Sequence, residues 1–237
     1  MPLDLVRIEA RNNEVAVLVY EPKRPRNVTI VAGHGYSSSK QNLDLLCAFL
    51  QSHGMRVFSL DFPGHKLGAS GGELRNMDDC VDAMSAVVDA ARAENVAPLY
   101  TLGHSMGAIT ALLVAAADPS VAGTVAIATG YGRPTAFSAL RGATDFRSSY
   151  VVGVDLPTLF EGVDVAFDRA LPKLAGRPVL YVAASRDAMV STASVRELYE
   201  RAPEPKAFAT IESDHTYAGE QARGEILQWL NHLHPRD

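Results

Sequence analysis

The feature that most constrains this chain is Gly103-His104-Ser105-Met106-Gly107, which has the form Gly-x-Ser-x-Gly. An apolar run over 98–102 precedes it, and a second apolar run over 108–115 follows it. This order predicts a strand, a sharp turn and a helix, a context in which the turn lifts the serine hydroxyl clear of the end of a sheet. The first N–H groups of the helix would then face whatever reacts beside Ser105.

The rest of the chain alternates predicted strands with predicted helices. The sequence predicts a hairpin over 5–20 and strands over 28–32, 56–61, 98–102, 121–129, 178–183 and 206–211. Besides the helix after Ser105, it predicts helices over 40–52, 76–94, 191–201 and 217–233. The alternation indicates an α/β fold with a mainly parallel sheet covered by helices on both faces. Residues 130–175 interrupt this rhythm and show no clear period.

Charge and composition exclude several classes of protein. The net charge of −5 argues against nucleic acid or an anionic membrane as the main partner. Met1–Glu9 carries charges where a secretory signal needs an apolar core, and no window has the roughly 18 uninterrupted apolar residues of a membrane helix. The two cysteines, Cys47 and Cys80, fall in predicted helices without metal or disulfide spacing. We expect buried free thiols and a cytoplasmic protein.

A base and an acid for Ser105 are found at two other strand ends. A serine hydroxyl becomes a good nucleophile when a base removes its proton and a carboxylate orients that base. Asp187 follows the strand 178–183, and His215 follows the strand 206–211. Because the carboxyl ends of parallel strands share one edge of a sheet, these residues are expected near Ser105, in the order Ser, Asp, His that this architecture uses.

Other histidines and carboxylates also lie at predicted strand ends. Structural roles are expected for three histidines, namely His34, His65 and His104, and the His104 side chain is expected to point away from Ser105. Asp214 adjoins His215, but adjacent side chains in a loop rarely face each other. Asp61 follows a different strand and is interpreted as a structural carboxylate.

The oxyanion of an acyl-transfer reaction needs hydrogen-bond donors. The N–H of Met106, directly after the serine, is one candidate, and the N–H of Tyr36, next to Gly35 and after the strand 28–32, is the other. No histidine or cysteine cluster has zinc spacing, and no Gly-x-Gly-x-x-Gly opens a helix. The sequence therefore implies no metal and no cofactor.

These residues resemble the motifs of the α/β-hydrolase family, and the resemblance covers nearly the full length. The matching pieces are His34-Gly35-Tyr36, Asp61-Phe62-Pro63-Gly64-His65, Gly103-His104-Ser105-Met106-Gly107, Ala184-Ser185-Arg186-Asp187 and Asp214-His215. Within the family the chain looks most like small bacterial serine esterases, including feruloyl-esterase-like and monoacylglycerol-lipase-like members. The resemblance implies one domain over residues 1–237 with the α/β-hydrolase fold, a mostly parallel eight-stranded sheet, and a cap, 130–175, inserted after the sixth strand.

The chain departs from the family pattern in two places. Lys66 stands where relatives usually have glycine after the Gly-His of the Asp61 loop. A single Gly35 replaces the multi-glycine oxyanion loop of some lipases, which fits a smaller acyl pocket.

The predicted cap carries apolar side chains suited to roofing a substrate pocket. We expect substrate contacts from Tyr131, Phe137, Phe146, Tyr150 and Phe160, together with Met189 from the loop after the strand 178–183. Charged residues interrupt the segment so often that it offers no broad apolar face for a lipid surface. A soluble ester with a short- to medium-chain or aromatic acyl group is therefore expected.

The sequence predicts a serine hydrolase that cleaves a carboxylic ester through an acyl-enzyme, with a small-molecule ester or thioester as its partner. A thioesterase for an acyl carrier is the first alternative. Three arginines, Arg133, Arg141 and Arg147, could then meet phosphate, although Asp145 and Asp155 indicate a solvated mixed surface. A peptidase, a hydrolase of carbon–carbon bonds and a ligand-binding module without activity also remain open, as does the oligomeric state.

Overall fold

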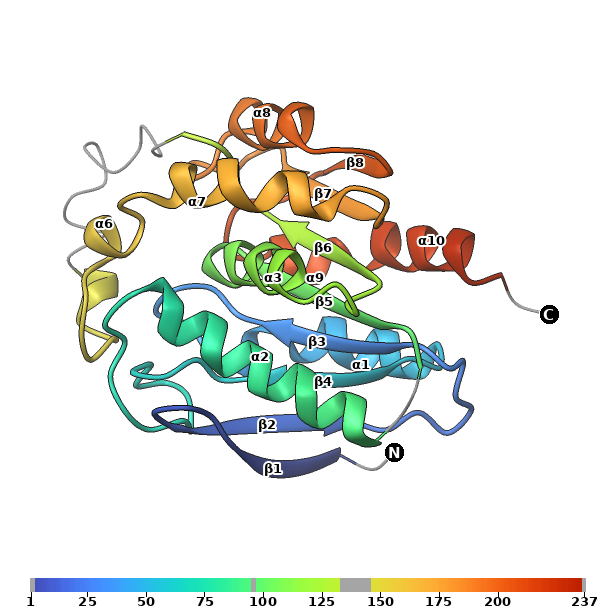
Figure 1. The fold of residues 1–237 in the computed structure, drawn as a ribbon, viewed down its shortest axis with the longest axis horizontal. Coiled ribbons are helices and arrows are strands. Elements are labelled where there is room, and N and C mark those ends of the chain that lie inside the picture. Colours follow the sequence, from blue (N-terminus) through green and yellow to red (C-terminus); the bar gives the residue numbers. More distant parts are fainter. Residues whose placement is uncertain (1–2, 95–96, 133–145, 236–237) are drawn as a thin grey trace.

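Figure 1 shows the chain in a computed structural model, which describes residues 3–94, 97–132 and 146–235. The described residues form an eight-stranded sheet with the order β1-β2-β4-β3-β5-β6-β7-β8. Antiparallel pairing joins β1 (Leu3–Glu9) to β2 (Glu14–Tyr20) and β2 to β4 (Arg56–Leu60). All other pairs are parallel, and they join β4, β3 (Thr29–Gly33), β5 (Leu99–His104), β6 (Gly123–Ile127), β7 (Val179–Ala184) and β8 (Lys206–Ile211). The predicted mainly parallel, eight-stranded α/β sheet is confirmed.

Helices cover the two faces of the sheet, because its inner strands are apolar on both sides and must be shielded from water on both. One face carries α2 (Met77–Glu94), α3 (Met106–Ala117), α7 (Val163–Ala170) and α8 (Thr192–Arg201), whose buried side chains include Val87, Ile109, Phe167 and Val195. The opposite face carries η1 (Lys40–Leu43), α1 (Asp44–Ser52), α9 (Ala218–Gln221) and α10 (Arg223–Leu233), with Leu46 and Ile226 among its buried side chains.

Most predicted bounds are shifted by one or two residues, and three elements differ in form. The helix predicted over 40–52 begins as a 3₁₀ turn, and the last helix is divided at Ala222 into α9 and α10. The strand predicted over 121–129 ends at Ile127, since Ala128 adopts a φ of 50°, a left-handed conformation that cannot continue a strand.

The segment between β6 and β7 contains two differently placed parts. Its first part, with α6 (Leu156–Leu159), lies beyond the carboxyl ends of the parallel strands, in yellow in Figure 1. Its second part, α7 followed by η2 (Leu171–Leu174), packs on α3 through the fully buried Phe167 and belongs to the helical layer on the sheet. Of the described residues in this segment, only 146–162, ahead of α7, are therefore placed where they can cover the sheet edge.

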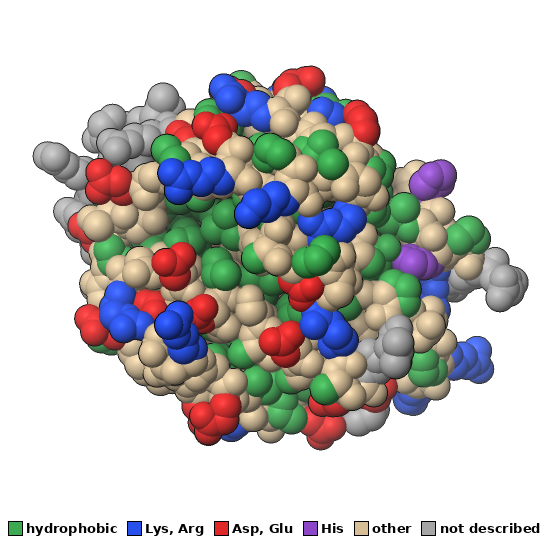
Figure 2. All heavy atoms as spheres, viewed as in Figure 1, with side chains coloured by type: hydrophobic (Ala, Val, Ile, Leu, Met, Phe, Trp, Pro, Cys, Tyr) green, Lys and Arg blue, Asp and Glu red, His purple; other side chains and the backbone are tan. Residues whose placement is uncertain are grey.

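The visible surface carries charges of both signs, and both cysteines are buried. Acidic and basic side chains are interspersed on the face shown in Figure 2. Cys47 on α1 and Cys80 on α2 are buried and free, as predicted, and burial raises the pKa of both thiols. Within the described ranges, no helix combines the length and the apolarity needed to cross a bilayer.

Candidate active site

Ser105 occupies a strained turn between β5 and α3. Its φ of 54° and ψ of −119° lie in a region that residues with a β-carbon rarely adopt. A β-carbon at position 103 would lie 2.0 Å from the Gly107 carbonyl oxygen, and one at position 107 would lie 2.2 Å from the Gly33 carbonyl oxygen. Both positions therefore require glycine, and the turn holds the Ser105 hydroxyl at the carboxyl edge of the sheet.

The structure brings Ser105, His215 and Asp187 into one chain of hydrogen bonds. His215 Nε2 lies 3.0 Å from Ser105 Oγ, and His215 Nδ1 lies 2.7 Å from Asp187 Oδ2. The three residues follow β5, β8 and β7, whose carboxyl ends share one edge, so their approach results from the parallel topology. A proton on Nδ1 donates to Asp187 and leaves Nε2 free to accept the serine proton.

The Asp187 carboxylate is held on both oxygens. Its Oδ1 accepts the N–H groups of Met189 and Val190, each at 2.8 Å, while Oδ2 accepts from His215. Burial alone would raise the pKa of Asp187, but the hydrogen bond from His215, the charge on that ring and the two N–H groups together lower it below its ordinary value. The carboxylate is thus ionised at neutral pH and fixes the orientation of the imidazole.

The other two carboxylates considered from the sequence have structural contacts. Asp214 Oδ1 accepts the N–H of Tyr217 at 3.0 Å, so this carboxylate caps its own turn. Asp61 is fully buried, pairs with the Lys40 ammonium, and accepts the N–H groups of Lys40 and Ala69 at 2.7 Å each. The burial of Lys40, whose side chain is 2% exposed, has no signal in the sequence, where it reads as a residue at the start of a helix.

His104 supports the backbone of His215. Its Nε2–H donates to the His215 carbonyl oxygen at 2.7 Å, and the two ring centroids lie 4.9 Å apart. Burial, and then the neighbouring His215, lower the pKa of His104 to about 3, so the ring is neutral at physiological pH. Its contact with the His215 backbone is structural, as predicted, but the ring does not point away from the site, because it lines the same cavity as Ser105.

His34 and His65 brace the loops on which the sequence placed them. His34 Nδ1–H donates to the Gly35 carbonyl oxygen at 2.7 Å, and His34 Nε2 accepts the N–H of Phe62 at 3.0 Å. His65 Nδ1–H donates to the Pro63 carbonyl oxygen at 3.0 Å. Burial, and then the neighbouring His65, lower the pKa of His34, which keeps its ring neutral and its two contacts in place.

The two predicted oxyanion donors belong to the residues that follow Gly35 and Ser105 in the chain. A β-carbon on Gly35 would lie 3.3 Å from Ser105 Cβ, so the absence of a side chain lets this loop approach the serine closely. Met106 is the first residue of α3, where an N–H has no partner within the helix. Neither the Met106 N–H nor the Tyr36 N–H donates to an acceptor among the described residues. The two N–H groups therefore stay candidates for binding an oxyanion.

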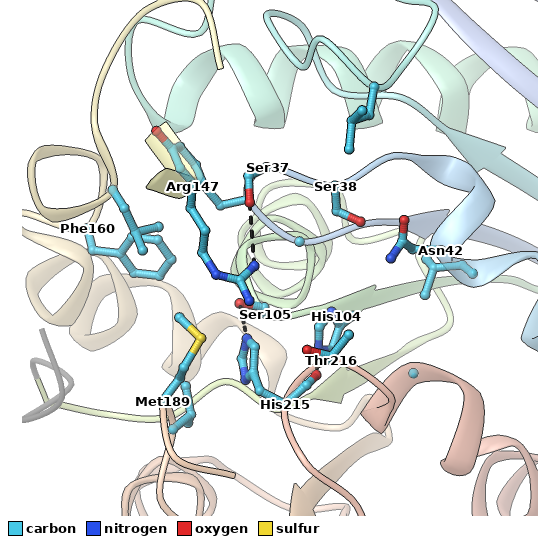
Figure 3. Close-up of a pocket in the computed structure, with 17 residues that line it drawn as sticks. Ser37, Ser38, Asn42, His104, Ser105, Arg147, Phe160, Met189, His215 and Thr216 are labelled. Carbon is cyan, nitrogen blue, oxygen red and sulfur yellow. Dashed lines mark hydrogen bonds between the residues drawn. The ribbon is translucent and has the colours of Figure 1, made fainter. Parts of the chain in front are cut away.

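A cavity of about 130 Å³, partly open to solvent, leads to Ser105 (Figure 3). Its apolar lining comes from Leu43, Leu67, Leu156, Phe160, Met189 and Val190, and its polar lining includes Ser37, Ser38, Asn42, Thr216 and Arg147. Figure 3 shows Phe160 and Met189 on one side, Ser38 and Asn42 on the other, and Arg147 between them. The cavity beside Ser105 is thus small, with an apolar side and a polar side.

Only some of the predicted substrate contacts line this cavity. Phe160 and Met189 do, and Tyr131 lines a neighbouring cavity that shares both of them. Phe146 and Tyr150 do not, which corrects the prediction: Phe146 is 64% exposed, and its ring packs edge-on against Tyr150 with centroids 5.2 Å apart. Arg147, on the same turn as Phe146, points into the cavity instead. Phe137 lies outside the described residues.

Arg147 is a cavity residue, although its charged neighbours predicted a solvated mixed surface. Its guanidinium lies inside the cavity that contains Ser105. The nearby Asp155, which contributed to that prediction, instead caps α6 by accepting the N–H of Thr158 at 2.9 Å. Arg133 and Arg141 lie outside the described residues.

Lys66 fits its loop without the conformational freedom of glycine. Its φ is not in the left-handed region; the preceding Gly64, with a φ of 75°, makes the turn instead. The Lys66 N–H donates to the Tyr150 carbonyl oxygen at 2.9 Å, and its ammonium donates to the Ser149 carbonyl oxygen at 2.7 Å. This loop is therefore tied to the segment between β6 and β7.

Comparisons with known proteins agree with this fold. A family model described as serine aminopeptidase, S33, matches residues 24–158, more than half of the chain. A monoglyceride lipase homolog of monkeypox virus is 30% identical over 114 residues, which are 46% of this chain and 41% of that protein. The chain spans less than half of the length of the curated relatives it matches.

Two solved structures share the fold at low sequence identity. The esterase Pf2001 of Pyrococcus furiosus has a TM-score of 0.71 and 19% identity, over 98% of this chain and 90% of that one. Est1E of Butyrivibrio proteoclasticus, with ferulic acid bound, has a TM-score of 0.72 and 18% identity, over 96% and 98%. At these identities the likeness concerns the fold alone.

Proposed function

This chain belongs to the serine aminopeptidase S33 family of α/β hydrolases, and we propose that within it the protein is a serine esterase that works through an acyl-enzyme. The observation that carries the proposal is the chain of hydrogen bonds from Ser105 through His215 to Asp187, at 3.0 and 2.7 Å. A serine at the end of such a chain, in a strained turn beside two free N–H groups, has every group that acyl transfer needs.

In the proposed mechanism Ser105 Oγ attacks the ester carbonyl carbon while His215 Nε2 takes the hydroxyl proton. The charge that develops on the carbonyl oxygen is bound by the N–H groups of Tyr36 and Met106. His215 then gives its proton to the alcohol oxygen, the carbon–oxygen bond breaks, and the alcohol leaves. A water molecule repeats the sequence on the acyl-enzyme and releases the acid, while Asp187 keeps the imidazole oriented throughout.

An ester is a better match to the cavity than a peptide with a free amino terminus. An aminopeptidase has to bind an ammonium group, which carboxylates recognise. Among the described residues that line the cavity there is no aspartate or glutamate, whereas Arg147 contributes a positive charge. The charge of the cavity therefore supports an ester as substrate.

The shape of the cavity supports a short- to medium-chain or aromatic acyl group. Phe160, Met189, Val190 and Leu156 provide an apolar wall beside Ser105, suited to one small apolar group. The ferulic acid bound to Est1E, which has the same fold, is an acid of the aromatic class. We also propose that residues 146–162 of this segment act as the cap, since Arg147, Leu156 and Phe160 come from them.

The buried free thiols of Cys47 and Cys80 support a reducing compartment, and we propose the cytoplasm.

A fluorophosphonate probe combined with an ester panel tests this function. The wild type should be labelled on one serine and should hydrolyse p-nitrophenyl esters of acetic, butyric and aromatic acids. Ser105→Ala should abolish both labelling and turnover, while Ser120→Ala, at an exposed serine, should abolish neither. Labelling that persists in Ser105→Ala would remove Ser105 from the mechanism, and turnover of thioesters without turnover of matched esters would favour the thioesterase.

A further inference from the structure

Arg147 brings an unmatched positive charge into the cavity. The residue is half-buried, and its Nη1–H donates to Ser37 Oγ at 3.5 Å, at the outer limit of a hydrogen bond. It forms no salt bridge with any other described residue. By contrast, Arg177 donates to the carbonyl oxygens of Ala115, Asp118 and Lys173, and Arg56 pairs with Glu21 and Glu94. A guanidinium has five N–H groups, so most of those on Arg147 have no acceptor among the described residues.

The guanidinium is directed toward the reacting centre. In Figure 3 it extends from the upper rim of the cavity past Ser37 to the side on which Ser105 lies. Its charge is one of the influences that lower the pKa of His104, after burial and His215, and both residues line the same cavity. A ligand group bound by Arg147 would therefore lie near the ester carbon.

The polar surroundings of Arg147 suit an anion. Four side chains with hydroxyl or amide donors line the same cavity, and they belong to Ser37, Ser38, Asn42 and Thr216. No acidic side chain among the described residues lines it to neutralise the guanidinium. Because removing a charge from water costs free energy unless the charge is paired, an anion entering the cavity would complete this arrangement.

We propose that Arg147 is a specificity-determining residue whose guanidinium binds a carboxylate carried by the substrate. The preferred substrate would then be an ester with a free carboxylate a few bonds from the scissile carbonyl, such as a half-ester of a short dicarboxylic acid. This inference rests on the proposed esterase function. A carboxylate fits better than the phosphate of an acyl carrier, because the whole pantetheine arm separates that phosphate from its thioester, whereas Arg147 and Ser105 share one cavity.

Matched pairs of esters measure the proposed preference directly. Monomethyl succinate is compared with methyl 4-oxopentanoate, in which a neutral methyl ketone replaces the carboxylate, and monomethyl glutarate is compared with methyl 5-oxohexanoate. In the wild type, kcat/KM should be roughly ten- to a hundredfold higher for the anionic member, the range that a charge-assisted hydrogen bond supplies. The preference should shrink with added salt, and free succinate should inhibit competitively.

Variants then assign the preference to Arg147. Arg147→Met should reduce the ratio of the two kcat/KM values to about one, and Arg147→Lys should keep part of it, since an ammonium retains the charge without the bidentate geometry. Arg169→Met, at an exposed arginine on α7 in the same segment, is the matched control and should keep the full ratio. Fluorophosphonate labelling of each variant verifies that its site has folded.

Several outcomes would overturn the inference. A ratio of the two kcat/KM values near one in the wild type would do so. An equal loss of kcat/KM on both esters in Arg147→Met would also do so, and it would indicate oxyanion stabilisation instead. The carboxylate assignment also fails if Arg147→Met lowers turnover of an acyl-coenzyme A with an uncharged acyl group while the wild type shows no preference for half-esters. Hydrolysis of the neutral esters alone leaves the esterase function intact, whereas hydrolysis of no ester overturns that function as well.

Discussion

Substitutions of His34 test whether this side chain positions the oxyanion donor without touching the substrate. The Gly35 carbonyl and the Tyr36 N–H belong to one planar peptide group and point in opposite directions. His34 Nδ1–H holds that carbonyl at 2.7 Å, so it also sets the direction of the Tyr36 N–H. Its other nitrogen accepts the Phe62 N–H at 3.0 Å and contributes to the fold of the next loop.

The two contacts predict separable effects. Removing a whole oxyanion donor costs about 10²–10³ in kcat, so a donor that is only misdirected in His34→Ala should cost about 10–100. His34→Asn keeps a donor near the position of Nδ1, and His34→Gln keeps an acceptor near the position of Nε2. We therefore expect His34→Asn to retain most of kcat, and His34→Gln to lose kcat but retain more stability. Leaving the buried Phe62 N–H without an acceptor should cost about 1–3 kcal/mol in free energy of unfolding.

The assay measures kcat on a short-chain p-nitrophenyl ester and thermal unfolding for all three variants. A positioning role predicts that kcat and stability do not follow the same order, with His34→Asn the more active and His34→Gln the more stable. A purely structural histidine would make the two quantities fall together. That result, or an unchanged kcat in His34→Ala, would refute the reasoning.

Three further predictions concern the triad, the strained turn and acid stability. Asp187→Asn should lower kcat by about 10³–10⁴, by analogy with a serine protease triad, whereas Asp214→Asn, which changes only a turn cap, should lower it far less; the reverse order would reassign the acid. Ser105→Gly should unfold at a higher temperature than Ser105→Ala, because glycine relieves a strain of about 1–3 kcal/mol at a φ of 54°, and equal melting temperatures in calorimetry would contradict this. The free energy of unfolding should fall between pH 6.5 and 4, because the pKa of His104 is lowered to about 3 in the folded protein and the unfolded chain takes up the proton first. The stabilisation from neutral His104 is complete above the unfolded pKa of about 6.5. It is lost at up to about 1.4 kcal/mol per pH unit as the pH falls toward the folded pKa. Urea titrations at pH 7 and pH 5 check the slope, which should be shallower in His104→Gln.

The fold and the positions of Ser105, Asp187 and His215 could be predicted because local pattern and topology constrain them strongly. Apolar runs identify the strands, and parallel strands bring their carboxyl ends to one edge. Three residues far apart in the chain therefore share one loop cluster without any knowledge of side-chain packing. The prediction that Asp214 does not orient His215 also needs no knowledge of side-chain packing, because it depends only on the direction of neighbouring side chains in a turn.

The composition of the pocket could not be predicted in the same way. Phe146, Arg147 and Tyr150 lie in a segment without a clear hydrophobic period, so nothing in the sequence states which side chain of this turn points inward. Hydrophobicity favoured the two aromatic residues, but the turn exposes Phe146 and directs Arg147 into the cavity. Lys66 was a departure from the family pattern without a consequence for the turn, because Gly64 supplies the left-handed residue.

The segment between β6 and β7 is connected to the oxyanion loop as well as to the cavity. The Tyr36 hydroxyl donates to the Val154 carbonyl oxygen at 2.9 Å, and Arg147 reaches Ser37 Oγ at 3.5 Å. Two supports therefore hold the loop of Tyr36 and Ser37. One is His34, through the Gly35 carbonyl, and the other is the segment between β6 and β7. Since Ser37 itself adopts a strained φ of 59°, the loop depends on both supports to keep the Tyr36 N–H beside Ser105. The residues proposed to select the substrate thus also help to hold the proposed oxyanion donor, so changes of specificity in this segment are expected to alter kcat together with KM.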